Sequence, residues 1–280
     1  MLKTNQAHQQ ALDQLLKMRY PALALKLCAT EADVPAGAEY PMRDWGKHIA
    51  LCQAFAYARR QGKTLCMTKA DHWCWTPLSS YGMTDASRGT VAFEEMVKTI
   101  GTQDPEKAAS FIENDLPHLP LGSCFGILVA PLDKADFDPD LILTYTSNGQ
   151  LRLMLMAVFS QTGKLVDSSF MPLESCIYSV IPPIREGNYR ITLPDPGEYE
   201  RALTGDDEII FSIPAQRSEE FFTGVARLLE VGHDVNSFFQ AMEPDFARPP
   251  FYNKVFASWG LDTGELWDKQ GLTVSGEKIR

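Results

Sequence analysis

The sequence lacks several patterns that would identify a common enzyme class. No two cysteines are separated by only two residues, so there is no signature of a zinc ribbon, a ferredoxin or a thioredoxin-like site. The GxGxxG and GxxxxGK[ST] patterns are absent, and neither a dinucleotide fold nor a phosphate loop is supported. A GxSxG nucleophile motif is missing as well. Nothing in the sequence therefore indicates a nucleotide enzyme or a serine hydrolase.

Basic charge is also scarce. The formal net charge is -10, from 36 acidic and 26 basic residues, and no Lys/Arg run exceeds the pair Arg59-Arg60. A protein that binds nucleic acid or anionic lipid needs a basic surface to neutralise phosphates. We therefore predict no nucleic-acid partner and no membrane partner.

Long apolar runs are missing too. No segment reaches the roughly eighteen apolar residues that a membrane-spanning helix needs, and the polar amino terminus with its spaced leucines does not resemble a signal peptide. These absences predict a cytoplasmic protein. In a reducing compartment the six cysteines are not expected to form structural disulfides. They are candidates for buried thiols, metal ligands or reactive thiols.

What is present predicts a globular α+β protein. The chain has 280 residues, 45% of them hydrophobic, which is enough for a sizeable core. We predict a single domain, residues 1–243, with a mixed, partly antiparallel sheet flanked by helices, and a C-terminal extension, residues 244–280, that wraps over the body or a partner. Apolar periodicity predicts helices at 6–18, 43–60, 91–100, 105–116, 149–160 and 218–231, and strands at 22–30, 64–67, 125–132, 141–146, 164–170, 189–194 and 208–214.

Residues 66–82, CMTKADHWCWTPLSSYG, concentrate chemically unusual side chains. Trp73 and Trp75 flank Cys74, so the segment is interpreted either as the wall of a site or as an aromatic plug in the core. His72 lies two residues before Cys74, and on a strand both side chains would share one face. His72 could then ligate a metal or lower the pKa of the thiol. The alternative is a histidine hydrogen-bonded beside Asp71.

The six cysteines are dispersed, and a fold can bring distant thiolates together around a metal. The hypothesis is an iron-sulfur cluster or another cysteine-ligated metal with a redox or accessory role. Cys52, Cys74 and Cys176 are the preferred ligands, and Cys66 or Cys124 would supply the fourth. The alternatives are buried structural thiols and reactive-thiol chemistry.

Several blocks also resemble a known family. These are the helix with Cys52, then Cys74 followed by Gly82, the block GILVAPLDKADFDPDLILTYTSNGQLRLMLMA with its PL-x-x-A-x-F-x-PD-x-x-x-x-Y pattern, then Cys176 and DDEIIFSIP. From Pro21 to about Leu229 the chain resembles the uncharacterised family called domain of unknown function 169, or ArCR. The resemblance implies no settled activity, but it implies cysteines at positions such as 52, 74 and 176. It also implies a cysteine after Gly197, where this chain has Glu198.

A second hypothesis concerns the turn after the strand at 141–146. Helix amides opening at a strand end form a natural pocket for a small anion. The cofactor-binding candidates there are Tyr145, Ser147, Asn148 and Gln150, and the alternative is an ordinary strand-to-helix turn. The acidic run 206–208 is predicted to be a solvated turn. A third hypothesis, an interaction subunit of a larger complex, rests on the C-terminal extension with Trp259 and Trp267. Whether the protein catalyses a reaction is left open.

Overall fold

A six-stranded sheet organises the chain. The computed structural model describes residues 1–236 and 249–261. The strands lie in the order β2-β3-β1-β4-β6-β5, and every neighbouring pair is antiparallel. Among these described residues, parallel pairing occurs only in the isolated bridges Glu39–Leu65 and Ile49–His72. The predicted α+β class is confirmed. The strands are β1 (Leu23–Cys28), β2 (Leu65–Thr68), β3 (Gly126–Pro131), β4 (Leu141–Thr146), β5 (Arg190–Thr192) and β6 (Ile209–Pro214).

Both faces of the sheet are covered, and the strand β3 is apolar on both of its sides for this reason. Ile127 and Val129 of β3 face one core, and Leu128 and Ala130 face the other. All six residues of β3, like those of β4, are buried. A strand covered on both faces does not need a polar side, so an unbroken apolar run is expected.

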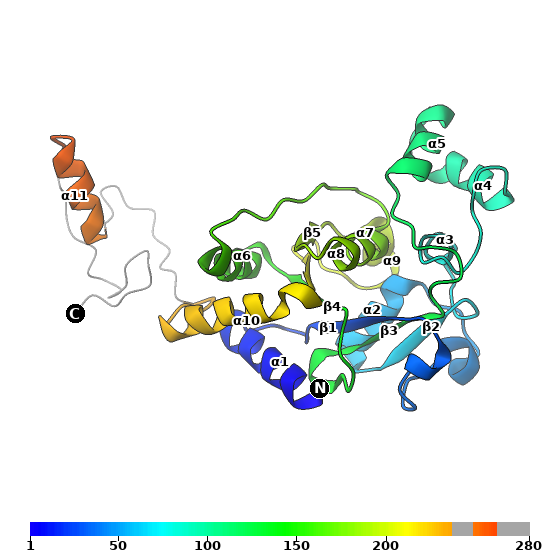
Figure 1. The fold of residues 1–280 in the computed structure, drawn as a ribbon, viewed down its shortest axis with the longest axis horizontal. Helices are drawn as coiled ribbons and strands as arrows, with labels where there is room; N and C mark the ends of the chain where they lie inside the picture. The colour runs from blue at the N-terminus through cyan, green and yellow to red at the C-terminus, as the bar shows by residue number, and fades with distance from the viewer. Residues whose placement is uncertain (237–248, 262–280) are drawn as a thin grey trace.

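Three long helices cover one face (Figure 1): α1 (Leu2–Leu16), α6 (Asn148–Thr162) and α10 (Ala215–Glu230). Helices α6 and α10 pack closely at Gly224, where an added Cβ atom would collide with the carbonyl of Ala157. The other face carries mainly shorter helices. These are α2 (Leu51–Gln61), α3 (Thr76–Ser80), α4 (Val91–Thr99), α5 (Pro105–Asn114), α7 (Ser175–Tyr178), α8 (Ile181–Glu186) and α9 (Pro196–Arg201).

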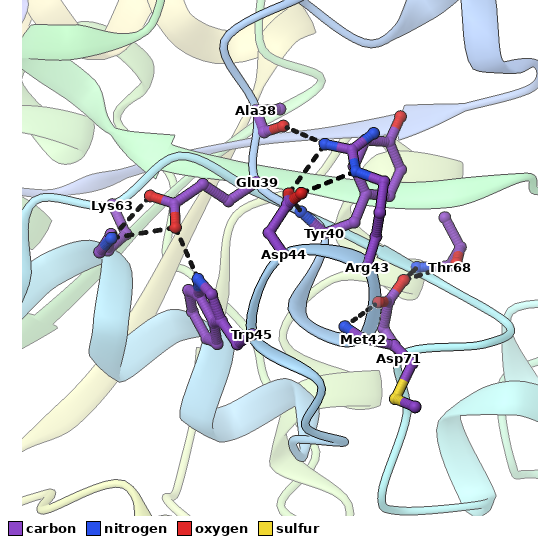
Figure 2. Close-up of polar contacts among 10 residues, drawn as sticks. All are labelled: Ala38, Glu39, Tyr40, Met42, Arg43, Asp44, Trp45, Lys63, Thr68 and Asp71. Carbon is purple, nitrogen blue, oxygen red and sulfur yellow. Dashed lines mark hydrogen bonds and ion pairs between the residues drawn. The ribbon is translucent and has the colours of Figure 1, made fainter.

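The helix predicted at 43–60 begins later than expected. Residues Pro41–Trp45 form a separate π-helical turn, η2, which Gly46 ends with a φ of 64°. Glu39 holds this turn, because its carboxylate accepts hydrogen bonds from Trp45 at 2.6 Å and from Lys63 at 2.7 Å (Figure 2). Two short 3-10 helices, η1 (Glu31–Asp33) and η3 (Leu132–Lys134), complete the connections around β1 and β3.

The strand predicted at 164–170 is wrong, because this segment forms no regular element. The alternation of apolar and polar side chains suggested a half-buried strand, but Leu165 is 84% exposed and Phe170 is 56% exposed. The segment instead runs beside β5, where Ser168 Oγ accepts a hydrogen bond from the backbone N–H of Ile191 at 2.8 Å.

The C-terminal part contains one described helix, α11 (Pro250–Ser258), which stands apart from the sheet and its helices in Figure 1. The rest of the predicted extension, residues 244–248 and 262–280 with Trp267, lies outside the described residues. Within residues 1–236 and 249–261, no helix combines the length and the apolar character that crossing a membrane requires.

Candidate functional site

Three of the six cysteines line one cavity of about 190 Å³, which we call the cysteine cavity. Cys52 comes from the first turn of α2, Cys74 from the loop between β2 and α3, and Cys176 from α7. Cys52 and Cys176 are buried, whereas Cys74 is partly exposed. The fold therefore gathers the three preferred ligands around one space. The remaining walls are Ala50, Leu51, Thr76, Pro77, Met96, Thr99, Ile100, Leu173, Glu174, Asp195, Pro196, Gly197 and Arg201.

Helix α2 positions Cys52 because its two sides have different neighbours. Phe55 and Ala58 pack into the core beneath the sheet, whereas Cys52 packs with Ala202 at the end of α9. At the start of the helix, the side chain of Gln53 accepts a hydrogen bond from the backbone N–H of Ala50 at 2.9 Å. This contact is one half of a capping box and helps to fix where the first turn begins.

Asp71 fixes the segment that carries Cys74. Its carboxylate accepts hydrogen bonds from the backbone N–H of Met42 at 2.8 Å and from the backbone N–H of Thr68 at 2.9 Å (Figure 2). Its own carbonyl accepts a hydrogen bond from the N–H of Ile49 at 3.0 Å. The segment is thus tied to η2 on one side and to the residues preceding α2 on the other. Cys74 consequently lies beside Cys52.

Cys176 is held by a short helix with a strained entry. Glu174, which precedes α7, has a φ of 60° and a ψ of 40°. This left-handed backbone costs a residue with a side chain roughly 1–2 kcal/mol. Asp195 supports the turn, because its carboxylate accepts a hydrogen bond from the N–H of Ser175 at 2.8 Å. The hydroxyl of Tyr81 donates to the carbonyl of Cys176 at 2.7 Å.

All three thiols are held in the protonated form by their surroundings. Burial, followed by the charge of Glu198, raises the pKa of Cys52 to about 12. Burial, followed by the charge of Glu174, raises the pKa of Cys74. Burial also raises the pKa of Cys176, and nearby carboxylates add to the effect. An unliganded cavity therefore holds neutral thiols at pH 7, and only a nearby cation would favour the thiolates.

The charged walls of the cavity carry more negative than positive groups. Glu174 and Asp195 contribute carboxylates, and Arg201 contributes one guanidinium. Burial, followed by the charge of Asp195, raises the pKa of Glu174 to about 7. Arg201 also lies 4.9 Å from the ring centre of Trp73. Trp73 is 61% exposed and Trp75 is 39% exposed, so the two tryptophans do not form a buried plug.

Behind the cavity lies a buried polar network centred on Glu198. Its carboxylate accepts hydrogen bonds from the hydroxyls of Tyr145 and Thr204, each at 2.8 Å. Arg59 lies 3.8 Å from the ring centre of Tyr145 and donates to both carboxylate oxygens of Glu208, at 2.6 and 3.2 Å. Glu208 is therefore not part of a fully solvated turn. The sequence marks Tyr145, Glu198 and Glu208 for separate reasons and gives no sign that they form one network.

The other cysteines lie in the sheet or next to it, and we call them the sheet cysteines: Cys28 on β1, Cys66 on β2 and Cys124 just before β3. Cys28 on β1 and Cys66 on β2 are fully buried on opposite sides of β3. They flank Gly126, where an added Cβ atom would lie 2.7 Å from Cys66 Sγ. Cys124 Sγ donates to the carbonyl of Gly126 at 3.5 Å. Neither Cys66 nor Cys124 lines the cysteine cavity, so the structure does not bring the predicted fourth ligand to it.

No metal-holding group is preformed in the described part of the chain, which contains all six cysteines. There, no set of three or more His, Cys, Asp or Glu side chains is arranged to hold a metal ion. His72, which precedes Cys74, is 8% exposed, and neither ring nitrogen has a hydrogen-bond partner among the described residues. Burial lowers the pKa of His72 to about 4, so its imidazole is neutral. The predicted hydrogen bond beside Asp71 is not formed.

Comparison of the sequence with known proteins identifies a family. The family described as uncharacterised ArCR, domain of unknown function 169, matches residues 11–224. The chain belongs to this family. An uncharacterized protein of Methanocaldococcus jannaschii is 21% identical to the ArCR chain over 219 residues, which cover 78% of this chain and 92% of that protein. No solved structure matches the chain.

The ArCR match contains all the structural parts of the candidate site. It includes every strand of the sheet and every residue that lines the cysteine cavity, and it ends within α10. Helix α11 lies beyond the matched residues. The cavity is therefore a feature of the ArCR domain itself, and not of the C-terminal extension.

The turn at the start of α6 is occupied by structural contacts. Ser147 Oγ accepts from the N–H of Gln150 at 3.4 Å, and Gln150 Oε1 accepts from the N–H of Ser147 at 2.8 Å, which completes a capping box. Gln150 Nε2 also donates to the carbonyl of Leu16 at 2.8 Å. Tyr145 faces the network around Glu198, and Asn148 lines a separate groove. The anion site at this turn stays a prediction, without a shared cavity to support it.

Proposed function

We propose that the ArCR protein binds a cysteine-ligated metal ion or a small iron-sulfur cluster in the cysteine cavity. The observation that supports this proposal is the convergence of Cys52, Cys74 and Cys176. Cys52 and Cys176 lie more than 120 positions apart in the sequence, yet all three cysteines line one space of about 190 Å³. Cysteines with purely structural roles would have no reason to line the same space.

The size of the cavity favours a small inorganic group. Pockets for organic ligands of drug size are usually about 300–1,000 Å³. A space of about 190 Å³ is below that range and suits an ion or a compact cluster. The chemistry agrees, because soft thiolate ligands favour zinc, copper(I) and iron-sulfur clusters. Glu174 and Asp195 on the walls also favour a cation over an anion.

The ligand set differs from the one expected from sequence. Cys66 and Cys124 do not line the cavity, so we assign the fourth donor position to Glu174, which lines it and lies two residues before Cys176 in the sequence. His72, a buried neutral imidazole without a hydrogen-bond partner among the described residues, does not line the cavity, so we do not assign it as a ligand. Because the donors are not preassembled, binding requires their side chains to turn toward a common centre.

Binding would change the protonation of the cavity residues. Each thiol that becomes a ligand releases a proton, so affinity falls as the pH is lowered. A bound metal would supply Lewis-acid chemistry, or electron transfer in the case of a cluster. The positive charge of the metal would reduce the electrostatic repulsion between the carboxylates of Glu174 and Asp195. The proposal places the protein in the cytoplasm, where the thiols stay reduced.

The test is direct metal analysis of the full chain purified without oxygen. We expect iron with sulfide, or zinc, at about one site per chain, and a thiolate-to-metal absorption band when the stripped protein is titrated with Co²⁺. The triple variant Cys52→Ser, Cys74→Ser, Cys176→Ser should lose both signals.

A matched variant controls for the general loss of thiols. Cys28→Ala, Cys66→Ala and Cys124→Ala remove the same number of cysteines from the sheet, and this variant, if folded, should keep the metal. The single variants Cys74→Ser and Cys124→Ala repeat the comparison with smaller changes. Equal metal binding by the wild-type chain and the cavity variant would refute the proposal, as would a wild-type chain that takes up none of the metals tested.

A further inference from the structure

An apolar groove lies on the other face of the sheet, between α6 and α10. It has a volume of about 800 Å³. Phe159 on its wall is 56% exposed, and Leu165, from the irregular segment that follows α6, is 84% exposed. Exposed apolar surface of this extent commonly marks a binding surface. The other apolar walls of the groove are Leu151, Leu155, Met156, Val166, Leu228 and Val231.

Helix α11 carries a matching apolar face. Phe251, Tyr252, Val255 and Trp259 are 46%, 37%, 38% and 66% exposed. At 3.6 residues per turn these four positions lie within an arc of about 100°. The helix has nine residues and buries none of them. Isolated helices shorter than about 12–15 residues are marginally stable in water. Helix α11 therefore needs a surface to pack against.

The chain leaves α10 at the edge of this groove. Val231 and His233 line it, and the N–H of Val235 donates to the carbonyl of Leu15 at 3.0 Å, which ties the start of the connection to α1. Residues 237–248 join this point to α11. Twelve residues span at most about 40 Å when extended, so the tether is long enough to return to a groove at its own base.

We propose that α11 docks with this aromatic face into the groove between α6 and α10 of its own chain. The contact is a helix-in-groove interaction, in which anchors at spacings of four residues enter an apolar channel. The tether decides between the same chain and a second copy. Joining two binding partners by a short stretch of one chain commonly gives an effective concentration in the millimolar range, which exceeds the micromolar concentration of a second copy in an ordinary solution. This interaction is independent of metal binding.

Hydrogen exchange of the full chain, read by mass spectrometry over residues 250–258, tests the docking. We expect exchange in the wild-type chain to be about tenfold slower than in Phe159→Glu or Trp259→Ser. Phe159 and Trp259 are exposed, so neither change disturbs the core. Leu165→Glu provides a second groove variant. Val91→Glu, at another exposed apolar side chain, on α4, is the control and should leave exchange of α11 unchanged.

Each alternative outcome has a distinct reading. Equal exchange in the wild-type chain and in all groove and tail variants would overturn the docking. Protection that survives Phe159→Glu and Leu165→Glu but not Trp259→Ser would overturn the groove as its site. Protection that falls on dilution, together with a dimer in sedimentation velocity, would replace the same-chain contact by a contact with a second copy.

Discussion

The two groups of three cysteines show how one residue type takes on different characters in one fold. The sheet cysteines lie on or beside strands whose hydrogen-bonded spacing leaves no room between neighbours. The cavity cysteines come from a helix start, a loop and a helix of four residues. Where such irregular ends meet, backbone groups and carboxylates face a shared space. The difference teaches that the candidate site forms where the ends of helices and loops meet. The thiols on or beside the strands, in contrast, are packed as part of the core.

The surroundings of the two groups differ in charge as well. The cavity is bordered by Glu174, Asp195 and Arg201, and Glu198 lies behind it. The sheet thiols Cys28 and Cys66 pack in an apolar core with α1 and α10. A hydrogen bond with the Cys28 thiol, followed by burial, raises the pKa of Cys66 far above its usual range. The three cavity cysteines thus share their space with carboxylates that would favour a bound cation.

The largest expected effect is a difference in alkylation rate. In the native chain, stripped of metal, Cys74 should react with N-ethylmaleimide first, because it is the only one of the six cysteines that is not buried. Cys28 and Cys66 should react only after unfolding, which costs at least about 5 kcal/mol in a typical domain and corresponds to roughly a thousandfold protection or more. Because the thiolate reacts and the pKa of Cys74 is raised, its labelling should accelerate as the pH rises above 7.

Peptide mass spectrometry at timed intervals measures this order. In urea all six cysteines should label at similar rates, which controls for intrinsic reactivity. Cys74→Ser should abolish the fast phase in the native chain. Labelling of Cys66 at the rate of Cys74 under native conditions would contradict the assignment of the two groups.

Much of the fold was predictable because the sheet follows simple patterns. The apolar runs at 125–132 and 141–146 correspond to β3 and β4, and Asp104-Pro105 starts α5 as the N-cap pattern predicts. Asp104 accepts hydrogen bonds from the N–H groups of Glu106 and Lys107. The alternation of apolar and polar residues at 164–170 predicted a strand wrongly, because Leu165 is exposed. A strand also needs a neighbouring strand to pair with and a face that is covered.

The site was predictable only in part. Cys52, Cys74 and Cys176 were chosen from sequence as a group, and the structure places them around one cavity. The sequence could not show that Cys66 and Cys124 lie away from this cavity, because they differ from the other three only in tertiary surroundings. Glu174 and Asp195 lie at the starts of very short helices, where no apolar period exists to show which side chains turn inward.

The cavity side and the sheet side should also differ in how their residues make stability depend on pH, because the buried carboxylate of Glu198 lies behind the cavity. Burial raises the pKa of Glu198 to about 7 in the folded chain, against about 4.5 for the ordinary side chain. As pH rises from 4.5 to 7, the unfolded state ionises first, so the folded state loses stability at about 1.4 kcal/mol per pH unit. Below pH 4.5 this loss is absent, and above pH 7 it is complete. Glu198→Gln should remove it, so the variant should gain about 2–3 kcal/mol relative to wild type between pH 5 and pH 8.

Urea unfolding of the metal-free proteins at pH 5, 6, 7 and 8 provides the measurement. Glu95→Gln, at an exposed position on α4, is the matched control and should follow the wild-type curve. Cys66→Ala should change stability by the same amount at every pH, because it leaves the carboxylates unchanged. Parallel curves for wild type and Glu198→Gln would mean that the carboxylate is already ionised in the folded chain at pH 5.

The smallest expected effect is at Gly126, and it tests how tightly the sheet cysteines are packed. An added Cβ would lie 2.7 Å from Cys66 Sγ, closer than real contacts allow. Gly126→Ala should therefore destabilise the fold by about 1 kcal/mol in urea unfolding. In a Cys66→Ala background the sulfur is gone, and the cost should fall by at least about 0.5 kcal/mol in a double-mutant cycle. Gly149→Ala, near the start of α6 with no contact closer than 3.9 Å, should instead stabilise the chain slightly. A cost at Gly126 that does not depend on Cys66 would show that the backbone of β3, and not the thiol packing, requires glycine there.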